Sequence, residues 1–213
     1  MQTPTLLFDL DGTLTDPAEG FINSIRYALG PTPGTRLSDA ELVRFIGPPL
    51  RGTISTLLGT DNAEEVEHAV ARYRQRYQEL GMFENRVYDG IPEALQTLHE
   101  AGARMFVATS KMTFFARAIL QHFGLDHYFA GIYGSLPGVL LDNKTDLLKH
   151  LFHTEGIAPT TATMIGDRNV DMIAARANNC RAVGVAWGYG SLQELQEAGA
   201  ELILDAPAKL STL

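Results

Sequence analysis

The stretch Thr5-Leu6-Leu7-Phe8-Asp9-Leu10-Asp11-Gly12-Thr13 joins a short apolar run to a loop that carries two carboxylates. The apolar run is too short and ends too abruptly for a helix, so it predicts a β-strand. Aspartate and glycine are typical of the turn that follows such a strand. In an open parallel sheet, ligands bind at the carboxyl ends of the strands. The stretch therefore places Asp9 and Asp11 where a ligand site is expected.

After residue 84 the sequence alternates short apolar runs with helical patterns. Strands are expected near 104–108, 131–133, 163–165, 181–185 and 202–204, and helices near 91–100, 114–123, 144–153, 170–177 and 192–198. This alternation predicts parallel βαβ units, and right-handed crossovers then place helices on both faces of the sheet. We therefore expect an α/β fold with a doubly wound, mostly parallel sheet.

A helical region interrupts this pattern directly after the first strand. It contains the capping-box sequence Ser38-Asp39-Ala40-Glu41, and Gly47-Pro48-Pro49 forces a break between two of its helices. We expect an α/β core of residues 1–15 and 84–213, with an inserted all-helical cap of residues 16–83. Because the insertion follows the carboxylate loop, we expect it to act as a lid over the ligand site.

Further polar residues follow other expected strands or begin the helices after them. Thr109 and Ser110 follow one strand, Asp167 and Asp171 follow another, and Lys144 begins a helix. If these strands are neighbours, the carboxylates, hydroxyls and ammonium converge in one crevice. Clustered carboxylates repel one another and need a cation, and oxygen ligands without histidine or thiolate favour Mg²⁺. A Mg²⁺ beside a lysine and a hydroxyl suits a phosphate group.

These motifs together resemble those of the haloacid-dehalogenase-like phosphohydrolases. Asp9-Leu10-Asp11-Gly12-Thr13, Thr109, Lys144 and Gly166-Asp167 with Asp171 occur in the order of that family. The resemblance covers essentially the whole chain, and it implies a Rossmann-like core with a helical cap.

Two further segments are similar to the phosphoglycolate-phosphatase-like branch of that family, which includes 5′-nucleotidases. They are Phe45-Ile46-Gly47-Pro48-Pro49-Leu50 and Gly184-Val185-Ala186-Trp187-Gly188-Tyr189-Gly190. Lys144-Thr145-Asp146 follows the form of the nucleotidase-like relatives, whereas phosphoglycolate phosphatases often have proline after this lysine.

The resemblance implies roles for the acidic residues. Asp9 would be the nucleophile, and Asp11 would be the general acid and then the general base. The metal would be held by the side chains of Asp9 and Asp167 and by the backbone carbonyl of Asp11. Asp171 would act in the second coordination shell or brace Lys144.

The resemblance also implies roles in substrate binding. Thr109, the backbone amide of Ser110, and Lys144 would bind the phosphate. Gly47 matches the substrate-specificity loop of the cap, and Arg51 lies beside that loop. Arg72, Arg74 and Arg76 are spread around one helix, so we expect them to be solvated and not to form a nucleic-acid site.

The leading hypothesis is a Mg²⁺-dependent phosphatase that hydrolyses a small phosphomonoester, of the phosphoglycolate or nucleoside 5′-monophosphate type, through an aspartyl-phosphate. The alternatives are a phosphosugar mutase on the same scaffold and a catalytically inactive phosphate-binding regulatory protein. The expected partner is a small phosphorylated metabolite.

Composition limits the other classes of function. The 213 residues carry a net charge of −8, which argues against nucleic acid or an anionic membrane as a partner. Cys180 is the one cysteine, so an intramolecular disulfide is impossible and a reducing compartment is expected. No stretch reaches the roughly 18 apolar residues of a membrane span. We expect a cytoplasmic protein, either a monomer or a homodimer.

Overall fold

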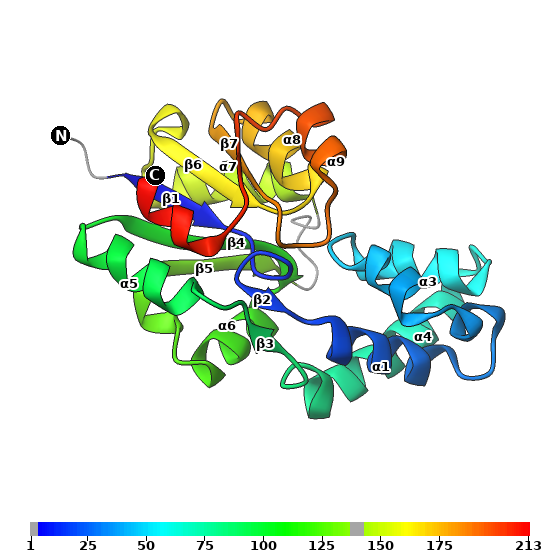
Figure 1. Cartoon of the computed structure of the whole chain (residues 1–213). Coiled ribbons are helices and arrows are strands. Elements are labelled where there is room, and N and C mark those ends of the chain that lie inside the picture. Colours follow the sequence, from blue (N-terminus) through cyan, green and yellow to red (C-terminus); the bar gives the residue numbers. More distant parts are fainter. Residues whose placement is uncertain (1–3, 137–142) are drawn as a thin grey trace. The chain divides into compact units, whose positions relative to one another are not determined.

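The computed structural model describes residues 4–136 and 143–213, which form two compact units (Figure 1). One unit comprises Met1–Asp16 and Val87–Leu213, and the other comprises Pro17–Arg86. The second unit is thus inserted into the first just after the carboxylate loop.

The first unit is built on a six-stranded parallel sheet with the order β5-β4-β1-β6-β7-β8. The strands are β1 (Thr5–Phe8), β4 (Arg104–Met112), β5 (Phe129–Ser135), β6 (Ala162–Gly166), β7 (Arg181–Val185) and β8 (Leu202–Leu204). β1 lies in the interior of the sheet, and Phe8 is paired with Val107 on one side and with Ile165 on the other. Its side chains are buried, as expected for an apolar strand covered on both faces.

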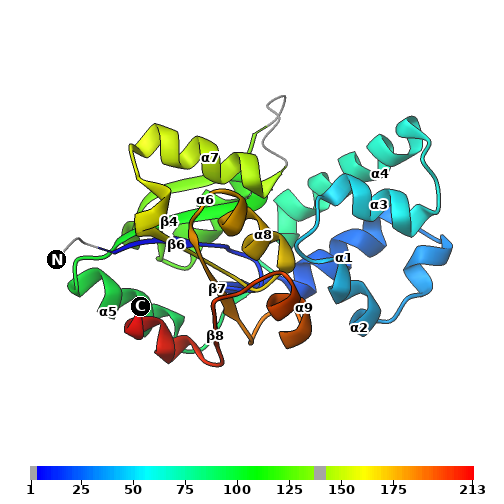
Figure 2. The ribbon, with the colours of Figure 1, turned by 90° about the horizontal axis from the view of Figure 1, so that it is seen from above.

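Helices cover both faces of this sheet (Figures 1 and 2). Their bounds are α5 (Ile91–Glu100), α6 (Thr113–His122), α7 (Lys144–Glu155), α8 (Asn169–Ala177) and α9 (Leu192–Glu197). Leu147, Leu148 and Leu151 of α7 pack with Leu7 and Met164 of the sheet in one core cluster. α5 and α6 lie on the opposite face, as right-handed crossovers require. The predicted doubly wound α/β fold is confirmed.

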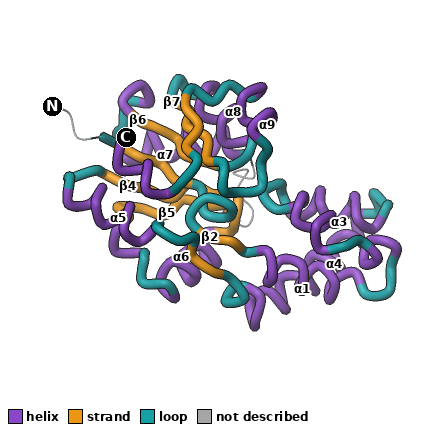
Figure 3. Tube along the Cα trace, in the orientation of Figure 1, coloured by secondary structure: helices purple, strands orange, loops and turns teal. Residues whose placement is uncertain are grey.

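The second unit is helical (Figure 3). It contains α1 (Ala18–Leu29), α2 (Asp39–Leu42), α3 (Leu50–Leu58), α4 (Ala63–Arg76) and a π-helical turn (Tyr77–Gly81). Ser38 and Glu41 form the expected capping box at the start of α2. The ring of Phe21 packs edge-on against that of Tyr73, with centroids 6.1 Å apart, and this contact joins α1 to α4. Gly47-Pro48-Pro49 lies directly before α3.

Three details differ from the sequence-based expectations. β4 continues through Thr109, Ser110 and Lys111 to Met112, because the end of the strand pairs irregularly with β5. A two-stranded sheet forms from β2 (Thr15–Asp16) and β3 (Arg86–Val87), where no strand was expected. A 3₁₀ helix from Pro207 to Thr212 was also not expected.

In the described ranges, no helix combines the length and the apolar composition that crossing a bilayer requires.

Candidate active site

Asp9 is the first residue after β1, and the sheet fixes its backbone. Its amide donates to the carbonyl of Ile165 in β6 at 2.9 Å, which continues the pairing of β1 with β6 by one step. The amide of Leu10 donates to Oδ1 of Asp9 at 2.8 Å. The side chain of Asp9 is almost fully buried. Its carboxylate is therefore held in a defined orientation at the carboxyl end of an interior strand.

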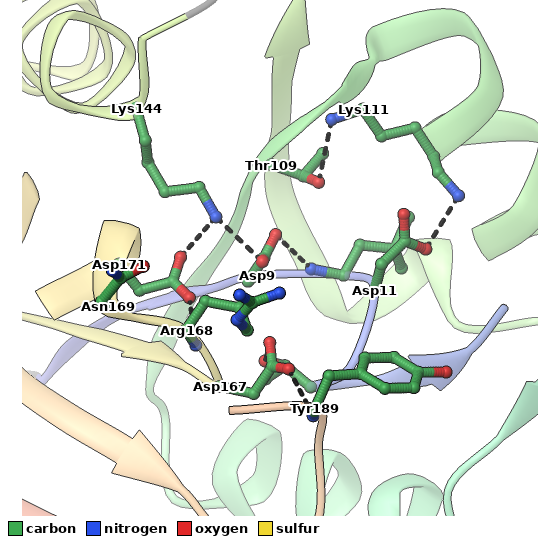
Figure 4. A network of polar contacts seen from close by, with 12 residues as sticks. Asp9, Asp11, Thr109, Lys111, Lys144, Asp167, Arg168, Asn169, Asp171 and Tyr189 are labelled. Carbon is green, nitrogen blue, oxygen red and sulfur yellow. Dashed lines mark hydrogen bonds and ion pairs between the residues drawn. The ribbon is translucent and has the colours of Figure 1, made fainter. Parts of the chain in front are cut away.

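Two further carboxylates meet Asp9 at this edge of the sheet (Figure 4). Asp167 follows β6, and Asp171 lies in the first turn of α8, where a helical turn brings it back toward Asp9. One carboxylate oxygen from each of the three residues lies within 4.8 Å of the others, and all three residues are buried. The structure thus brings together the acids that the motifs predicted to meet.

Lys144 lies among these acids at the start of α7. Its Nζ lies 2.9 Å from Oδ2 of Asp9 and also forms an ion pair with Oδ1 of Asp171. The other oxygen of Asp171 accepts a hydrogen bond of 3.0 Å from the amide of Arg168. Both oxygens of Asp171 are therefore engaged within the protein, which agrees with its expected role in bracing Lys144.

Burial and crowding shift the proton affinities of these groups. Burial raises the pKa of Asp167 well above its usual range, and the charges of Asp171 and Asp9 add to this rise. Burial raises the pKa of Asp171 to about 6, although the charge of Lys144 opposes the rise. Burial by itself would lower the pKa of Lys144, but the charges of Asp171 and Asp9 outweigh it and raise that pKa. The acids are thus crowded, and their ionised forms need compensating charge.

Asp11 faces a different cation. Its Oδ1 lies 2.8 Å from Nζ of Lys111 at the end of β4, and Figure 4 shows this pair beside Asp9. Burial raises the pKa of Asp11, and the ion pair with Lys111 opposes this rise without cancelling it. A carboxyl with a raised pKa, placed two residues after Asp9, is suited to proton transfer.

Thr109 and Ser110 lie near the end of β4, next to β1. Thr109 is buried, and its Oγ1 accepts a hydrogen bond of 3.2 Å from the amide of Lys111. Ser110 is half-buried on the same strand. Because Phe8 pairs with Val107, the register places these hydroxyl residues just beyond the level of Asp9. A hydroxyl, amides and the ammonium of Lys144 thus gather around the carboxylate.

The three buried acids fit a divalent cation. Three carboxylates face the one ammonium of Lys144 in this group, so two formal negative charges remain uncompensated. All the candidate ligand atoms are carboxylate oxygens, which suit Mg²⁺ better than a metal that prefers nitrogen or sulfur. Each of the three acids has both oxygens engaged within the protein, so these contacts do not rank them as ligands. The resemblance implies that the side-chain ligands are Asp9 and Asp167.

Gly47 and Arg51, the residues expected in a specificity loop, belong to the helical unit. Gly47 has a φ of +108°, a backbone conformation that favours glycine. Arg51 is an exposed residue of α3, and its Nη2 donates to Oε2 of Glu67 in α4 at 2.9 Å. Within this unit Arg51 therefore joins two helices.

Sequence reasoning missed three groups that support the acids. The amide of Tyr189 donates to Oδ2 of Asp167 at 2.8 Å. The indole Nε1 of Trp187 donates to the carbonyl of Thr13 at 3.0 Å. Oε1 of Glu194 accepts from both Arg168 Nε and the amide of Asn169, each at 2.9 Å. The segment of residues 184–190 was visible as similar to a branch of the family, but no role in the site was assigned to it, and no pattern pointed to Glu194.

Comparisons with known proteins place the chain in a family. Residues 6–185 match the family described as haloacid dehalogenase-like hydrolase. A 5′-nucleotidase of Pseudomonas aeruginosa is 44% identical over 196 residues, which cover 92% of this chain and 88% of that protein. A tyrosine-protein kinase PtkA of Mycobacterium tuberculosis is 36% identical over 207 residues, covering 96% of this chain and 70% of that protein.

The fold has a close counterpart among solved structures. The crystal structure of a predicted phosphatase from Clostridium acetobutylicum has a TM-score of 0.91 and 39% identity, and the match covers 100% of this chain and 98% of that one. Among more distant relatives, a phosphoglycolate phosphatase of Haemophilus influenzae is 29% identical over 97% of this chain and 96% of that protein. The resemblance first seen in the Asp9–Thr13 motif is thus confirmed, and the chain belongs to the haloacid dehalogenase-like hydrolase family.

Proposed function

We propose that the protein is a Mg²⁺-dependent phosphatase that hydrolyses a small phosphomonoester through an aspartyl-phosphate on Asp9. The observation that carries this proposal is the buried group formed by Asp9, Asp167, Asp171 and Lys144, with the Asp11–Lys111 pair beside it. A bound Mg²⁺ would supply charge stabilisation to the transferring phosphoryl group.

In the first step, an oxygen of the Asp9 carboxylate attacks phosphorus. The new bond joins Asp9 to phosphorus while the bond from phosphorus to the leaving oxygen breaks. Asp11 donates its proton to that oxygen, and its raised pKa supports the protonated form that this step requires. The hydrogen bond from the Leu10 amide keeps the Asp9 carboxylate from rotating.

In the second step, water replaces Asp9 on phosphorus. Asp11, now ionised, takes a proton from this water as the water oxygen bonds to phosphorus. The bond between Asp9 and phosphorus then breaks, which restores the carboxylate and releases inorganic phosphate. Lys144 stabilises the negative charge on Asp9 and on the phosphoryl oxygens, while Thr109 and the amide of Ser110 donate hydrogen bonds to those oxygens.

We propose that the preferred substrate is a nucleoside 5′-monophosphate, and that phosphoglycolate is a poorer substrate. The relative named 5′-nucleotidase is 44% identical, whereas the phosphoglycolate phosphatase of Haemophilus influenzae is 29% identical. The sequence Lys144-Thr145-Asp146 supports the same order, since it has the nucleotidase-like form.

The test is release of inorganic phosphate from a panel of nucleoside monophosphates, phosphoglycolate, sugar phosphates and p-nitrophenyl phosphate. We expect Mg²⁺-dependent turnover that excess EDTA abolishes, with the highest kcat/KM on a nucleoside 5′-monophosphate. Asp9→Asn should remove turnover because an amide is a far poorer nucleophile. Asp146→Asn, an exposed change on α7, is the matched control and should remain active.

Three further outcomes separate this proposal from its alternatives. Full activity in excess chelator, or in Asp9→Asn, would contradict the proposed chemistry. A requirement for a bisphosphate activator, with phosphate returned to the sugar, would indicate a mutase. Because one relative is named a tyrosine-protein kinase, ATP is tested in addition to this panel. Transfer of its phosphate to protein tyrosine without phosphatase activity would favour a kinase.

A further inference from the structure

A short segment after β7, Trp187–Gly190, contacts both of the loops that carry the candidate catalytic acids. The sheet joins these loops only at their beginning. The last paired residues of β1 and β6 are Phe8 and Ile165, and the amide of Asp9 adds one more hydrogen bond to Ile165. Asp167 and the turn up to Asp16 lie beyond that point. Their relative placement must therefore be fixed by contacts outside the sheet.

One such contact is direct, because the Thr13 hydroxyl donates to Oδ1 of Asp167 at 3.4 Å. The segment supplies three further hydrogen bonds. Nε1 of Trp187 donates to the carbonyl of Thr13 at 3.0 Å, which ties the segment to the loop after β1. The amide of Tyr189 donates to Oδ2 of Asp167 at 2.8 Å, and Figure 4 shows the Tyr189 ring extending away from this acid. The Tyr189 hydroxyl donates to Oδ1 of Asp16 at the end of the same loop.

Two glycines allow the segment to pack directly on the acid. A Cβ at Gly188 would lie 2.3 Å from the Cβ of Asp167 and 2.3 Å from the carbonyl oxygen of Gly12. A Cβ at Gly190 would lie 1.9 Å from the carbonyl oxygen of Asp167. Real Cβ atoms do not approach other atoms this closely, so the fit requires the absence of side chains at both positions.

We infer that the Trp187–Gly190 segment positions Asp167 toward Asp9, with Tyr189 as the positioning residue that ties Asp167 to the end of the Asp9 loop. This inference rests on the function proposed above. The amide of Tyr189 fixes one oxygen of Asp167. The hydroxyl of Tyr189 is held by Asp16, and this contact keeps the residue, and therefore its amide, in place. Contacts of this kind around a metal ligand typically change metal affinity or activity about 10–100-fold when they are removed.

The test removes one hydroxyl. Tyr189→Phe keeps the ring and the amide but loses the hydrogen bond to Asp16. The matched control is Tyr133→Phe, because the Tyr133 hydroxyl also donates to a carboxylate of the same unit, Oε1 of Glu155, at 2.5 Å. Each variant is titrated with Mg²⁺ by calorimetry in the absence of substrate, and its unfolding free energy is measured.

We expect the Kd for Mg²⁺ to rise about tenfold in Tyr189→Phe and to stay within about twofold of wild type in Tyr133→Phe. The Mg²⁺ concentration for half-maximal phosphatase activity should rise in parallel, while KM at saturating Mg²⁺ stays unchanged. A merely structural role would lower stability in both variants without this difference in metal affinity. Trp187→Phe, which removes the hydrogen bond to Thr13, should weaken Mg²⁺ binding as well.

Two patterns of results would overturn the inference in different ways. If wild type binds Mg²⁺ and hydrolyses phosphomonoesters, but Tyr189→Phe and folded Trp187→Phe bind Mg²⁺ as tightly as wild type, the positioning role alone is wrong. Equal weakening in Tyr189→Phe and Tyr133→Phe would also overturn it. If wild type neither binds Mg²⁺ nor hydrolyses any substrate of the panel, the proposed function is wrong, and this inference is then wrong as well.

Discussion

Nζ of Lys144 lies 2.9 Å from Oδ2 of Asp9, and both side chains are almost completely buried. The same ammonium pairs with Asp171, so one cation offsets two carboxylates. An intact buried ion pair is often no more stabilising than apolar residues of similar size. Removing only one partner is costly, because it leaves a buried charge uncompensated. The lysine is therefore required for the acids to remain close together.

Lys144→Met should lower both activity and stability. We expect the unfolding free energy to fall by about 3–5 kcal/mol, because the variant leaves Asp9 and Asp171 without their cation. We expect kcat to fall at least about 100-fold, since stabilisation of charge in a buried site is commonly worth that much. Urea unfolding and phosphate release measure the two effects.

Added Mg²⁺ should restore part of the stability of Lys144→Met, since a cation can offset the same carboxylates. The matched control is Lys209→Met, which removes an exposed pair with Asp205 and should change stability by less than about 0.5 kcal/mol. A Lys144→Met variant as stable as this control would contradict the electrostatic account.

Asp11→Asn should slow the enzyme most on substrates with poor leaving groups. Asparagine cannot donate a proton to the leaving oxygen, and general acid catalysis is typically worth about 10²–10⁴-fold. The p-nitrophenolate ion leaves without protonation, so the loss in kcat/KM should be much smaller on p-nitrophenyl phosphate than on an alkyl phosphate. Equal losses on the two substrates would show that Asp11 does not donate the proton.

The Arg76–Glu84 pair should make the stability of the helical unit depend on pH. Nη1 and Nη2 of Arg76 donate to the two carboxylate oxygens of Glu84 at 2.8 and 2.9 Å, and these hydrogen bonds lower the pKa of Glu84. The usual pKa of a glutamate is about 4.3, so the pair contributes its full stability above that pH. The contribution disappears as pH falls through the lowered pKa of the folded state.

Glu84→Gln should therefore destabilise the protein by about 1 kcal/mol at pH 7, and the difference from wild type should shrink as the pH falls below about 4. Urea unfolding at a series of pH values measures this. Glu79→Gln, an exposed change in the same unit, provides the control and should show little difference at any pH. A Glu84→Gln effect that grows on acidification would have the wrong sign for this linkage.

Arg51→Ala should change substrate preference, because the resemblance places Arg51 beside the specificity loop. We expect relative kcat/KM among three phosphomonoesters to change by about tenfold, the size of effect that one or two polar contacts produce. Arg26→Ala is the control, since Arg26 forms a similar exposed ion pair with Asp39 in the same unit. If both variants lower kcat/KM by one common factor on every substrate, Arg51 has only its structural role between α3 and α4.

The apolar strands were the most predictable part of the fold. Nearly all residues of β1, β6 and β7 are buried, so apolar residues predominate in these strands and their limits are visible in sequence to within one residue. The end of β4 was not visible in this way, because Thr109, Ser110 and Lys111 are polar and are typical of a loop. Their strand conformation depends on pairing with β5, which local sequence does not encode.

The acids of the site were predictable because each lies within three residues of the end of a strand or the start of a helix. Their supporting groups were not, since the contact of Tyr189 with Asp167 uses a backbone amide that every residue type except proline possesses. Arg76 shows the same limit. It was expected to be solvated, but the π-helical turn after α4 lets the chain return, and Glu84 then pairs with it. That expectation was wrong for a reason that lies in tertiary structure.

The interior position of β1 also governs the order in which the protein can fold during its synthesis. Thr5 pairs with Arg104 on one side and with Ala162 on the other, so both neighbours of β1 are translated long after it. At a translation rate of about 5–20 residues per second, β4 is synthesised on the order of 5–20 s after β1, and β6 is synthesised later still. The contiguous Pro17–Arg86 unit is complete during that interval. On the ribosome, the helical insertion can therefore acquire its structure before β1 has any partner strand, and the acidic site is among the last features to form.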